Sequence, residues 1–452
     1  MADNIINPDV AISKKEASIM INALAAGEVP KLGVQHIAVG RNNEIDSLDY
    51  VFDSVIDGQS RMKVWVGDFG SGKSFMLHLI RLMAHNRNFV VSEIAFTPSL
   101  RLYSTKGSAQ ALYRAIAKKI SIRTKPNGNA LQTLIELWLE QLQEKVAREK
   151  GVSPESLFEE SSLEMMNEEI RKAVGSFEGV GDQNFATVLI RYYEGWAKFD
   201  ETLIENALKW LVGDYTDKRS AKRDLGVTEI INDDNYIGYL RLLTQLFILA
   251  GYSGFVINLD ECVNLYQITN STRQKNYEVI LELFNICANT KVHGLFINLA
   301  GTQKFLFDRN KGLYSYGALQ TRLEVNPYAK GELRDYDQVV FVLEPLSPEA
   351  QSVLYERLLY VYNVAYDTQI QLTQEDMQMM MNMCQAQGLD LPRKMIRHYL
   401  GLLNIMRQNP GISFAEACGK AKVQDDDQED QEDRGEIPLG PEFFDESEVD
   451  EI

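Results

Sequence analysis

The sequence contains few residues that build disulfides or metal sites, and it has no long apolar run. None of its four cysteines belongs to a C-x-x-C pair, and its five histidines show no metal-ligand spacing. This pattern excludes a disulfide framework and a cysteine-rich zinc site, and it indicates a reduced, cytoplasmic environment. The longest apolar run is far shorter than a membrane span, and the first residues lack a basic-then-apolar signal, so no membrane partner is expected.

Basic residues are outnumbered by acidic ones, and the formal net charge is −18. Residues 424–452 contain fourteen acidic residues and one basic residue, a net charge of −13, which leaves about −5 for the rest of the chain. This acidic low-complexity tail has few apolar anchors and is predicted to be disordered. The charge of the remaining chain neither supports nor excludes contact with DNA. At 452 residues the chain exceeds one ordinary core, so two or three domains are expected.

One stretch, residues 67–74, fits the phosphate-binding P-loop pattern G-x-x-x-x-G-K-[ST] at every fixed position. A predicted strand at 62–66 precedes it, and the apolar start of a predicted helix at 75–80 follows it, as the motif requires. The alternative is a glycine-rich turn that binds nothing, but chance matches seldom have both flanks. The expected nucleotide-binding residues are Gly67, Asp68, Phe69, Gly70, Ser71, Gly72, Lys73, Ser74 and Phe75.

Each fixed position of this loop has a physical role. The glycines allow backbone shapes that a Cβ would block, so successive N–H groups can surround phosphate oxygens at the positive end of the next helix. We expect Lys73 to reach the β- and γ-phosphates and the Ser74 hydroxyl to bind Mg²⁺. The predicted ligands are therefore ATP and Mg²⁺. No N-K-x-D segment follows to read guanine, which disfavours a GTPase.

A second stretch, residues 255–261, is nearly continuously apolar and ends in two carboxylates, Asp260 and Glu261. Such a run is typical of a central parallel strand buried on both faces, and ligands bind at the carboxyl end of such strands. We expect Asp260 to hold Mg²⁺, directly or through water, and Glu261 to position the water that attacks the γ-phosphate. The alternative is an acidic cap for the next helix.

Three more apolar runs predict strands at 89–96, 294–299 and 339–343. With the two strands above, they predict an α/β fold: a parallel five-stranded P-loop NTPase sheet with helices on both faces, a long helical insertion and a C-terminal helical lid. Helices are expected at 14–26, 108–122, 129–150, 154–177, 184–212, 236–250 and 274–288. The expected divisions are an N-terminal arm and helix at 1–32, the core at 33–96 and 236–346, the insertion at 97–235, the lid at 347–423 and the tail at 424–452.

Two basic groups lie within the insertion: Lys118, Lys119, Arg123 and Lys125, and then Lys218, Arg219, Lys222 and Arg223. Basic groups can contact the phosphate backbone of DNA, but solvated faces are commoner. Both interpretations stay open.

A short segment ending in V-G-R, just upstream of the P-loop, is expected to be extended and resembles the adenine-side segment of AAA+ ATPases. The resemblance implies that the chain from His36 through Val39 and Gly40 to Arg41 passes the base, although an ordinary loop before a surface helix is the alternative.

The same resemblance implies three further site residues. Thr302 follows a strand and is the candidate for a polar sensor of the γ-phosphate, with Asn298 second. Arg322 lies where AAA+ proteins carry an arginine finger that reaches a neighbouring subunit's nucleotide, and a surface ion pair is its alternative. Arg393 begins the last long helix of the lid, where it can touch the γ-phosphate.

Taken in order, these motifs resemble AAA+ and STAND-class P-loop ATPases, with a layout similar to the origin-recognition-like branch. The phrases FVINLDECVNLYQITNSTRQKNYEVILELFN, GLFINLAGTQKFLFD, GLYSYGALQTRL and LPRKMIRHYL resemble the BREX-type ATP-binding proteins of bacterial phage-defence islands. That resemblance covers most of residues 33–407. It implies an ATPase that remodels or loads a partner, and the expected partners are further copies of the chain, DNA, and a co-encoded helicase or methyltransferase-type defence protein.

Two other functions fit the same residues. In the first, ATP binding sets an assembly state and hydrolysis is negligible, as in several STAND-like switches. In the second, the chain is a DNA-binding module and the nucleotide only stabilises its fold.

Overall fold

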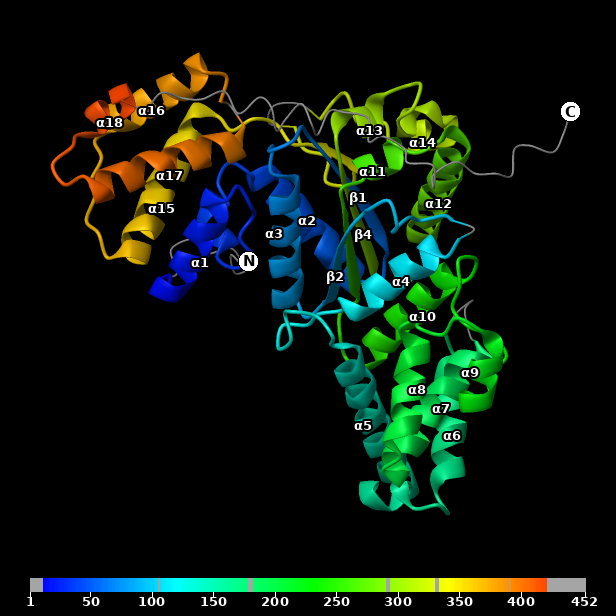
Figure 1. Ribbon diagram of the computed structural model, residues 1–452. Coiled ribbons are helices and arrows are strands. Elements are labelled where there is room, and N and C mark those ends of the chain that lie inside the picture. The colour runs from blue at the N-terminus through cyan, green and yellow to red at the C-terminus, as the bar shows by residue number, and fades with distance from the viewer. Residues whose placement is uncertain are drawn as a thin grey trace, which may run out of the picture.

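A five-stranded, all-parallel sheet forms the centre of the structure (Figure 1). The computed structural model describes residues 11–104, 106–177, 182–289, 293–329, 333–389 and 391–420, so the predicted acidic tail lies outside the described residues. The strand order is β2-β3-β4-β1-β5. All five predicted strands are confirmed, and their bounds are β1 Arg61–Val66, β2 Val90–Ala95, β3 Phe255–Asp260, β4 Leu295–Gly301 and β5 Val340–Val342.

Alternate residues of each strand pack against different helices, because successive side chains point to opposite faces of a sheet. Trp65 and Phe296 pack on α2 (Asn42–Ile56) and α3 (Lys73–Asn86), which cover one face. Val64 and Ile297 face the other side, in a core that includes several helices and is continuous with the insertion. Among those helices are α4 (Ser108–Lys118), α10 (Tyr236–Leu249) and α12 (Asn270–Ala288). Burial on both faces explains why the strands are nearly continuous apolar runs.

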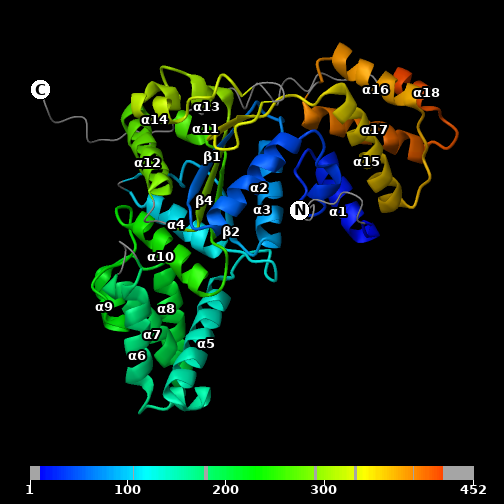
Figure 2. The ribbon, with the colours of Figure 1, turned by 180° about the vertical axis from the view of Figure 1, so that it is seen from behind.

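The insertion forms an elongated helical body at one end of the sheet (Figures 1 and 2). Its elements are α5 (Leu131–Lys150), η2 (Pro154–Phe158), α6 (Leu163–Gly175), α7 (Gln183–Lys198), α8 (Glu201–Leu211) and α9 (Lys218–Leu225).

Two predictions of single long helices in the insertion were wrong. The predicted helix at 184–212 is a hairpin of α7 and α8, because Phe199 takes a left-handed backbone conformation (φ 55°) and Asp200 caps the Leu203 N–H. The predicted helix at 154–177 is split into η2 and α6, with the break at residues 159–162. In both regions the apolar spacing is helical on each side of the break, so periodicity alone does not locate it.

The lid lies on the other side of the sheet from the insertion (Figure 1). It contains α15 (Pro348–Tyr366), α16 (Gln374–Ala386), α17 (Pro392–Gln408) and α18 (Phe414–Lys420). The N-terminal helix α1 (Lys14–Ala25) packs into the same core through Ala17, Met20 and Ile21. The segment expected to be extended before α2 is instead a 3-10 helix, η1 (Val34–Ile37), which begins after Gly33 with φ 79°.

Short elements complete the core beyond the sheet: α11 (Val263–Tyr266), α13 (Gln303–Phe307), η3 (Leu313–Ser315) and α14 (Gly317–Arg322). The four cysteines, Cys262, Cys287, Cys384 and Cys418, are free thiols. Within the described ranges, no helix combines the length and apolar character that a membrane crossing requires.

Candidate active site

The P-loop runs from the end of β1 to the start of α3, as the motif predicts. Gly70 and Gly72 have φ angles of 83° and 104°, which side-chain-bearing residues rarely adopt. Gly67 is required for a different reason: a Cβ there would lie 2.3 Å from Ser71 Oγ. Ser71 Oγ is itself buried without a hydrogen-bond partner in the described structure. A buried orphan hydroxyl and a backbone kept open by glycine both fit a loop that receives an anionic ligand.

The Lys73 amine lies folded against this loop. Its Nζ donates to the carbonyl oxygens of Gly67 and Asp68, at 2.9 and 2.8 Å, and lies 5.3 Å from the centre of the Phe69 ring. Burial lowers the pKa of Lys73, and the carboxylates of Asp260 and Glu261 act in the opposite direction. A polyphosphate in the loop would add negative charge beside this amine and favour its protonated form.

A hydrogen bond joins the P-loop to the acidic end of β3. Ser74 Oγ donates to Asp260 Oδ2 at 2.7 Å, and the Glu261 N–H donates to Asp260 Oδ1 at 2.8 Å. Glu261 has a left-handed backbone (φ 55°), an uncommon conformation for this residue, and its side chain lines the adjoining pocket. The end of β3 therefore presents one carboxylate to the P-loop and the next to the pocket.

Ser74 and Asp260 fit a magnesium site whose remaining ligands would come from a bound nucleotide. Mg²⁺ is usually held by one or two carboxylates, hydroxyls and phosphate oxygens rather than by a full cage of protein ligands. The described ranges contain no cluster of three or more histidine, cysteine or acidic side chains suited to a metal. Ser74 Oγ and Asp260 Oδ2 are the oxygens that would hold Mg²⁺ here.

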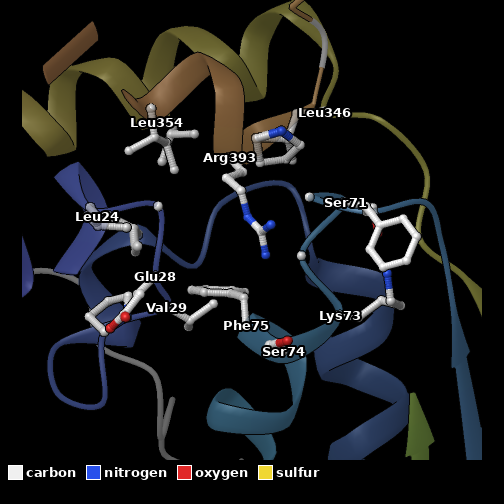
Figure 3. Close-up of a pocket in the computed structure, with 18 of the residues that line it drawn as sticks. Leu24, Glu28, Val29, Ser71, Lys73, Ser74, Phe75, Leu346, Leu354 and Arg393 are labelled. Atoms are coloured by element: carbon white, nitrogen blue, oxygen red, sulfur yellow. The ribbon is translucent and has the colours of Figure 1, made fainter. Parts of the chain in front are cut away.

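A pocket of about 880 Å³, open solvent included, extends from the P-loop toward the lid (Figure 3). The P-loop forms one end through Phe69, Gly70, Ser71, Gly72, Lys73, Ser74 and Phe75. The lid contributes Leu346, Leu354, Pro392, Arg393 and Ile396, and the chain upstream of the P-loop adds Ile37, Val39 and Arg41. One end of the pocket is therefore polar and rich in backbone N–H groups, whereas the other is largely apolar, as a nucleotide requires.

Arg393 and Arg41 are both brought to this pocket, in different ways. The Arg393 side chain projects from α17 into the pocket, and its backbone N–H donates to Gly70 O at 3.4 Å (Figure 3). Arg41 is only 5% exposed and donates to the carbonyls of Ser71 (3.2 Å) and Glu344 (3.0 Å). Arg41 thus ties the P-loop backbone to the chain that follows β5.

Other predicted residues do not line the pocket in the described structure. Thr302 is 8% exposed, and its hydroxyl caps α13 by accepting from the Phe305 N–H at 3.2 Å. Asn298 is fully buried in the middle of β4. Arg322 is exposed at the end of α14, where it donates to Ala318 O at 2.8 Å.

His36 and Gly40 also lie outside the pocket lining. His36 is buried in η1, 3% exposed. Gly40 has φ 68°, and a Cβ there would lie 2.9 Å from both Leu346 and Ala350. Gly40 therefore permits close contact with the lid.

Sequence reasoning missed one wall of the pocket. Leu24, at the end of α1, and the segment Gly27, Glu28, Val29 and Pro30 line the side opposite the P-loop (Figure 3). These residues form no motif, because they contribute apolar surface and backbone rather than a recognisable set of side chains. The only sequence signal is the helix end at Gly27, followed by an apolar residue and a proline shortly before the V-G-R segment.

The model of one family, BREX system ATP-binding protein BrxC/D, matches residues 12–422. The chain belongs to this family. The BrxC/D match is wider than the resemblance found from the motifs, since it includes α1 and all of the described lid. It supports an ATP-binding role in phage defence. No curated protein and no solved structure was found to match.

Proposed function

We propose that this BrxC/D protein is a MgATP-dependent ATPase that couples nucleotide binding and hydrolysis to the assembly or remodelling of a partner complex on DNA during phage defence. The observation that carries the proposal is the 2.7 Å contact between Ser74 Oγ and Asp260 Oδ2, with Glu261 lining the pocket beside it. This arrangement brings a phosphate-binding loop, two potential metal ligands and a further carboxylate to one point.

Each group has a distinct role in the proposed reaction. The P-loop N–H groups and Lys73 bind and orient the β- and γ-phosphates, and Mg²⁺ held by Ser74 and Asp260 neutralises charge on them. Glu261 orients the attacking water and accepts its proton. Arg393 approaches from the lid, so γ-phosphate binding and loss can change how the lid contacts the P-loop. The apolar end of the pocket accommodates the base and ribose.

Phosphate release at saturating ATP tests the proposal. Glu261→Gln should bind ATP as the wild type does but lose turnover by about 10²-fold or more, the scale of a general base. Glu205→Gln is the matched control, because Glu205 is exposed on α8 of the insertion and is not among the residues that line the pocket. Equal turnover in wild type and Glu261→Gln would remove this carboxylate from the mechanism. Lys73→Ala should abolish ATP binding.

A second candidate function is a nucleotide-gated switch with negligible turnover. It is favoured by the position of Thr302 and Arg322, neither of which reaches the pocket of the isolated chain. In the ATPase, Arg322 would act on the nucleotide of a neighbouring subunit, so assembly would precede turnover. Mass measurements with a non-hydrolysable ATP analogue, followed by phosphate release in the assembled state, distinguish the two. Assembly without turnover, with DNA and partner proteins present, would favour the switch.

Direct DNA contact belongs to the same proposal and has the two basic groups as candidates. Several of these cations are paired: Lys118 with Asp214 at 2.8 Å, and Arg223 with Asp224 at 2.9 Å. Arg219 and Lys222 are exposed on α9. Charge reversal at these two residues should weaken DNA binding and reduce its salt dependence. If DNA binding depends on salt but changes neither with ATP nor with Lys73→Ala, a DNA-binding module with a structural nucleotide would be favoured instead.

A further inference from the structure

A row of polar side chains crosses the face of the sheet that packs on α3. Glu93, Asn258, Asn298 and Lys63 occupy paired positions on β2, β3, β4 and β1. Asn298 Nδ2 donates to Asn258 Oδ1 at 3.1 Å, and Asn258 Nδ2 donates to the α3 carbonyl of Leu77 at 3.0 Å. Both amides are fully buried. Buried polar groups of this kind hold a helix in one position, because leaving them unpaired is costly.

At the β2 end of this row, His78 of α3 joins the sheet to the pocket wall. Its Nε2 lies 2.9 Å from Glu93 Oε1, and its Nδ1 lies 3.2 Å from Pro30 O. A carbonyl oxygen only accepts, so Nδ1 must donate to it. Although burial raises the pKa of Glu93, its contacts with His78 outweigh this effect and the pKa falls below its usual value. The two nitrogens of the His78 ring therefore face two different acceptors, the Glu93 carboxylate on β2 and the Pro30 carbonyl in the pocket wall.

Pro30, which contacts His78, belongs to the pocket wall that the sequence motifs did not predict. Pro30 lines the pocket together with Gly27, Glu28 and Val29, and Phe75 of α3 lines it one turn before His78. The N–H groups of Gly27 and Glu28 donate back to α1, to Leu24 O and Ala23 O. Because α1 packs in the lid core, the wall connects to the lid at its start and to α3 through His78.

We propose that His78 is a positioning residue for the base end of the nucleotide: by joining Pro30 O to Glu93, it fixes the Gly27–Pro30 wall against α3. This inference rests on the proposed ATP site. The P-loop contacts described above are made with Arg41, Arg393 and Asp260 and within the loop itself, and none of them involves His78 or Pro30. The loss of His78 should therefore weaken binding of the base and leave binding of the polyphosphate unchanged.

The test compares ATP with inorganic triphosphate, which occupies the P-loop but lacks base and ribose. His78→Ala should weaken ATP binding by about tenfold, the scale of one hydrogen bond to a charged group, and change triphosphate binding less than about twofold. His78→Gln, which keeps one donor and a similar volume, is measured as well in case the alanine variant folds poorly. It too should weaken ATP binding and leave triphosphate binding nearly unchanged. His78→Arg keeps two donors and should restore much of the ATP affinity.

His85→Ala is the matched control. His85 lies on the same helix, is 8% exposed and contacts Ser121 at 3.2 Å, at the end of α3 away from the pocket. Its loss can lower stability but should change the affinity for neither ligand.

The outcomes separate the inference from the function on which it rests. A wild type that binds neither ligand overturns both. A wild type that binds ATP, with His78 variants that bind it equally well, overturns only the role of His78. An equal loss of ATP and triphosphate in the His78 variants would also overturn it, because the substitution would then act through the P-loop.

Discussion

Gly67→Ala tests whether the first residue of the P-loop must be glycine because Ser71 leaves no room for a Cβ. The added Cβ would lie 2.3 Å from Ser71 Oγ and 3.0 Å from Ser71 Cβ, and the next contact, Leu343 Cβ, is at an ordinary 3.4 Å. Overpacking of this kind costs about 1–3 kcal/mol. If this cost destabilises the ATP-bound conformation of the loop and not the free one, ATP affinity should fall by roughly 5- to 150-fold.

The clash is with one side chain, so its removal should rescue the variant. ATP dissociation constants of wild type, Gly67→Ala, Ser71→Gly and the double variant, measured by calorimetry, form a double-mutant cycle. The double variant should bind ATP nearly as tightly as Ser71→Gly alone. Gly72→Ala is the contrast: its nearest contact is 4.0 Å away, but φ is 104°, so its strain is in the backbone and Ser71→Gly should not relieve it. A double variant that binds as poorly as Gly67→Ala would refute the steric explanation.

Three further predictions concern stability, measured by denaturant unfolding. Arg41→Ala should cost about 3 kcal/mol, because the carbonyls of Ser71 and Glu344 lose a charged donor and the Glu44 carboxylate loses its ion-pair partner. The exposed Arg219→Ala should cost less than about 0.5 kcal/mol. Burial lowers the pKa of Lys63 to about 7 in the folded protein. Above pH 7 the Lys63 amine is therefore neutral in the folded state but still protonated in the unfolded state. The free energy of unfolding of the wild type, relative to Lys63→Met, should then rise by up to about 1.4 kcal/mol per pH unit toward pH 10. Equal pH slopes would contradict this. Gly195→Ala should destabilise the α7–α8 hairpin by about 1–3 kcal/mol, because its Cβ would lie 2.9 Å from Ile204 and 3.1 Å from Asp200 O, whereas Gly238→Ala, with open space around it, should be neutral or stabilising.

The sequence was most informative where side-chain chemistry and backbone geometry occur at fixed spacing. The P-loop at 67–74 and the strand ending at Asp260 predicted the parallel sheet, which is confirmed. They also predicted Ser74 and Asp260 as ligands of one Mg²⁺, and in the structure these two side chains lie 2.7 Å apart. Five apolar runs located the five strands, because strands buried on both faces need continuous apolar residues.

The parts that were missed depend on tertiary packing. The Gly27–Pro30 wall contributes apolar surface and backbone, and His78 contacts it from a helix 48 residues away in sequence. Asn298 was a plausible sensor by position, but the structure buries it in mid-strand, where its Oδ1 accepts a hydrogen bond from Trp65 Nε1 at 3.0 Å. The break at Phe199 was missed because helical spacing continues on both sides of it.

The most direct test of the central claim is the effect of Mg²⁺ on ATP binding in the wild type and in Asp260→Asn. Asparagine keeps the size of the side chain and an oxygen acceptor but loses the charge that would hold the ion. If the P-loop and the β3 carboxylates share one magnesium-bound triphosphate, Mg²⁺ should tighten ATP binding by roughly tenfold or more in the wild type and have little effect in Asp260→Asn. The same Mg²⁺ dependence in both proteins, or no ATP binding by the wild type, would contradict the account.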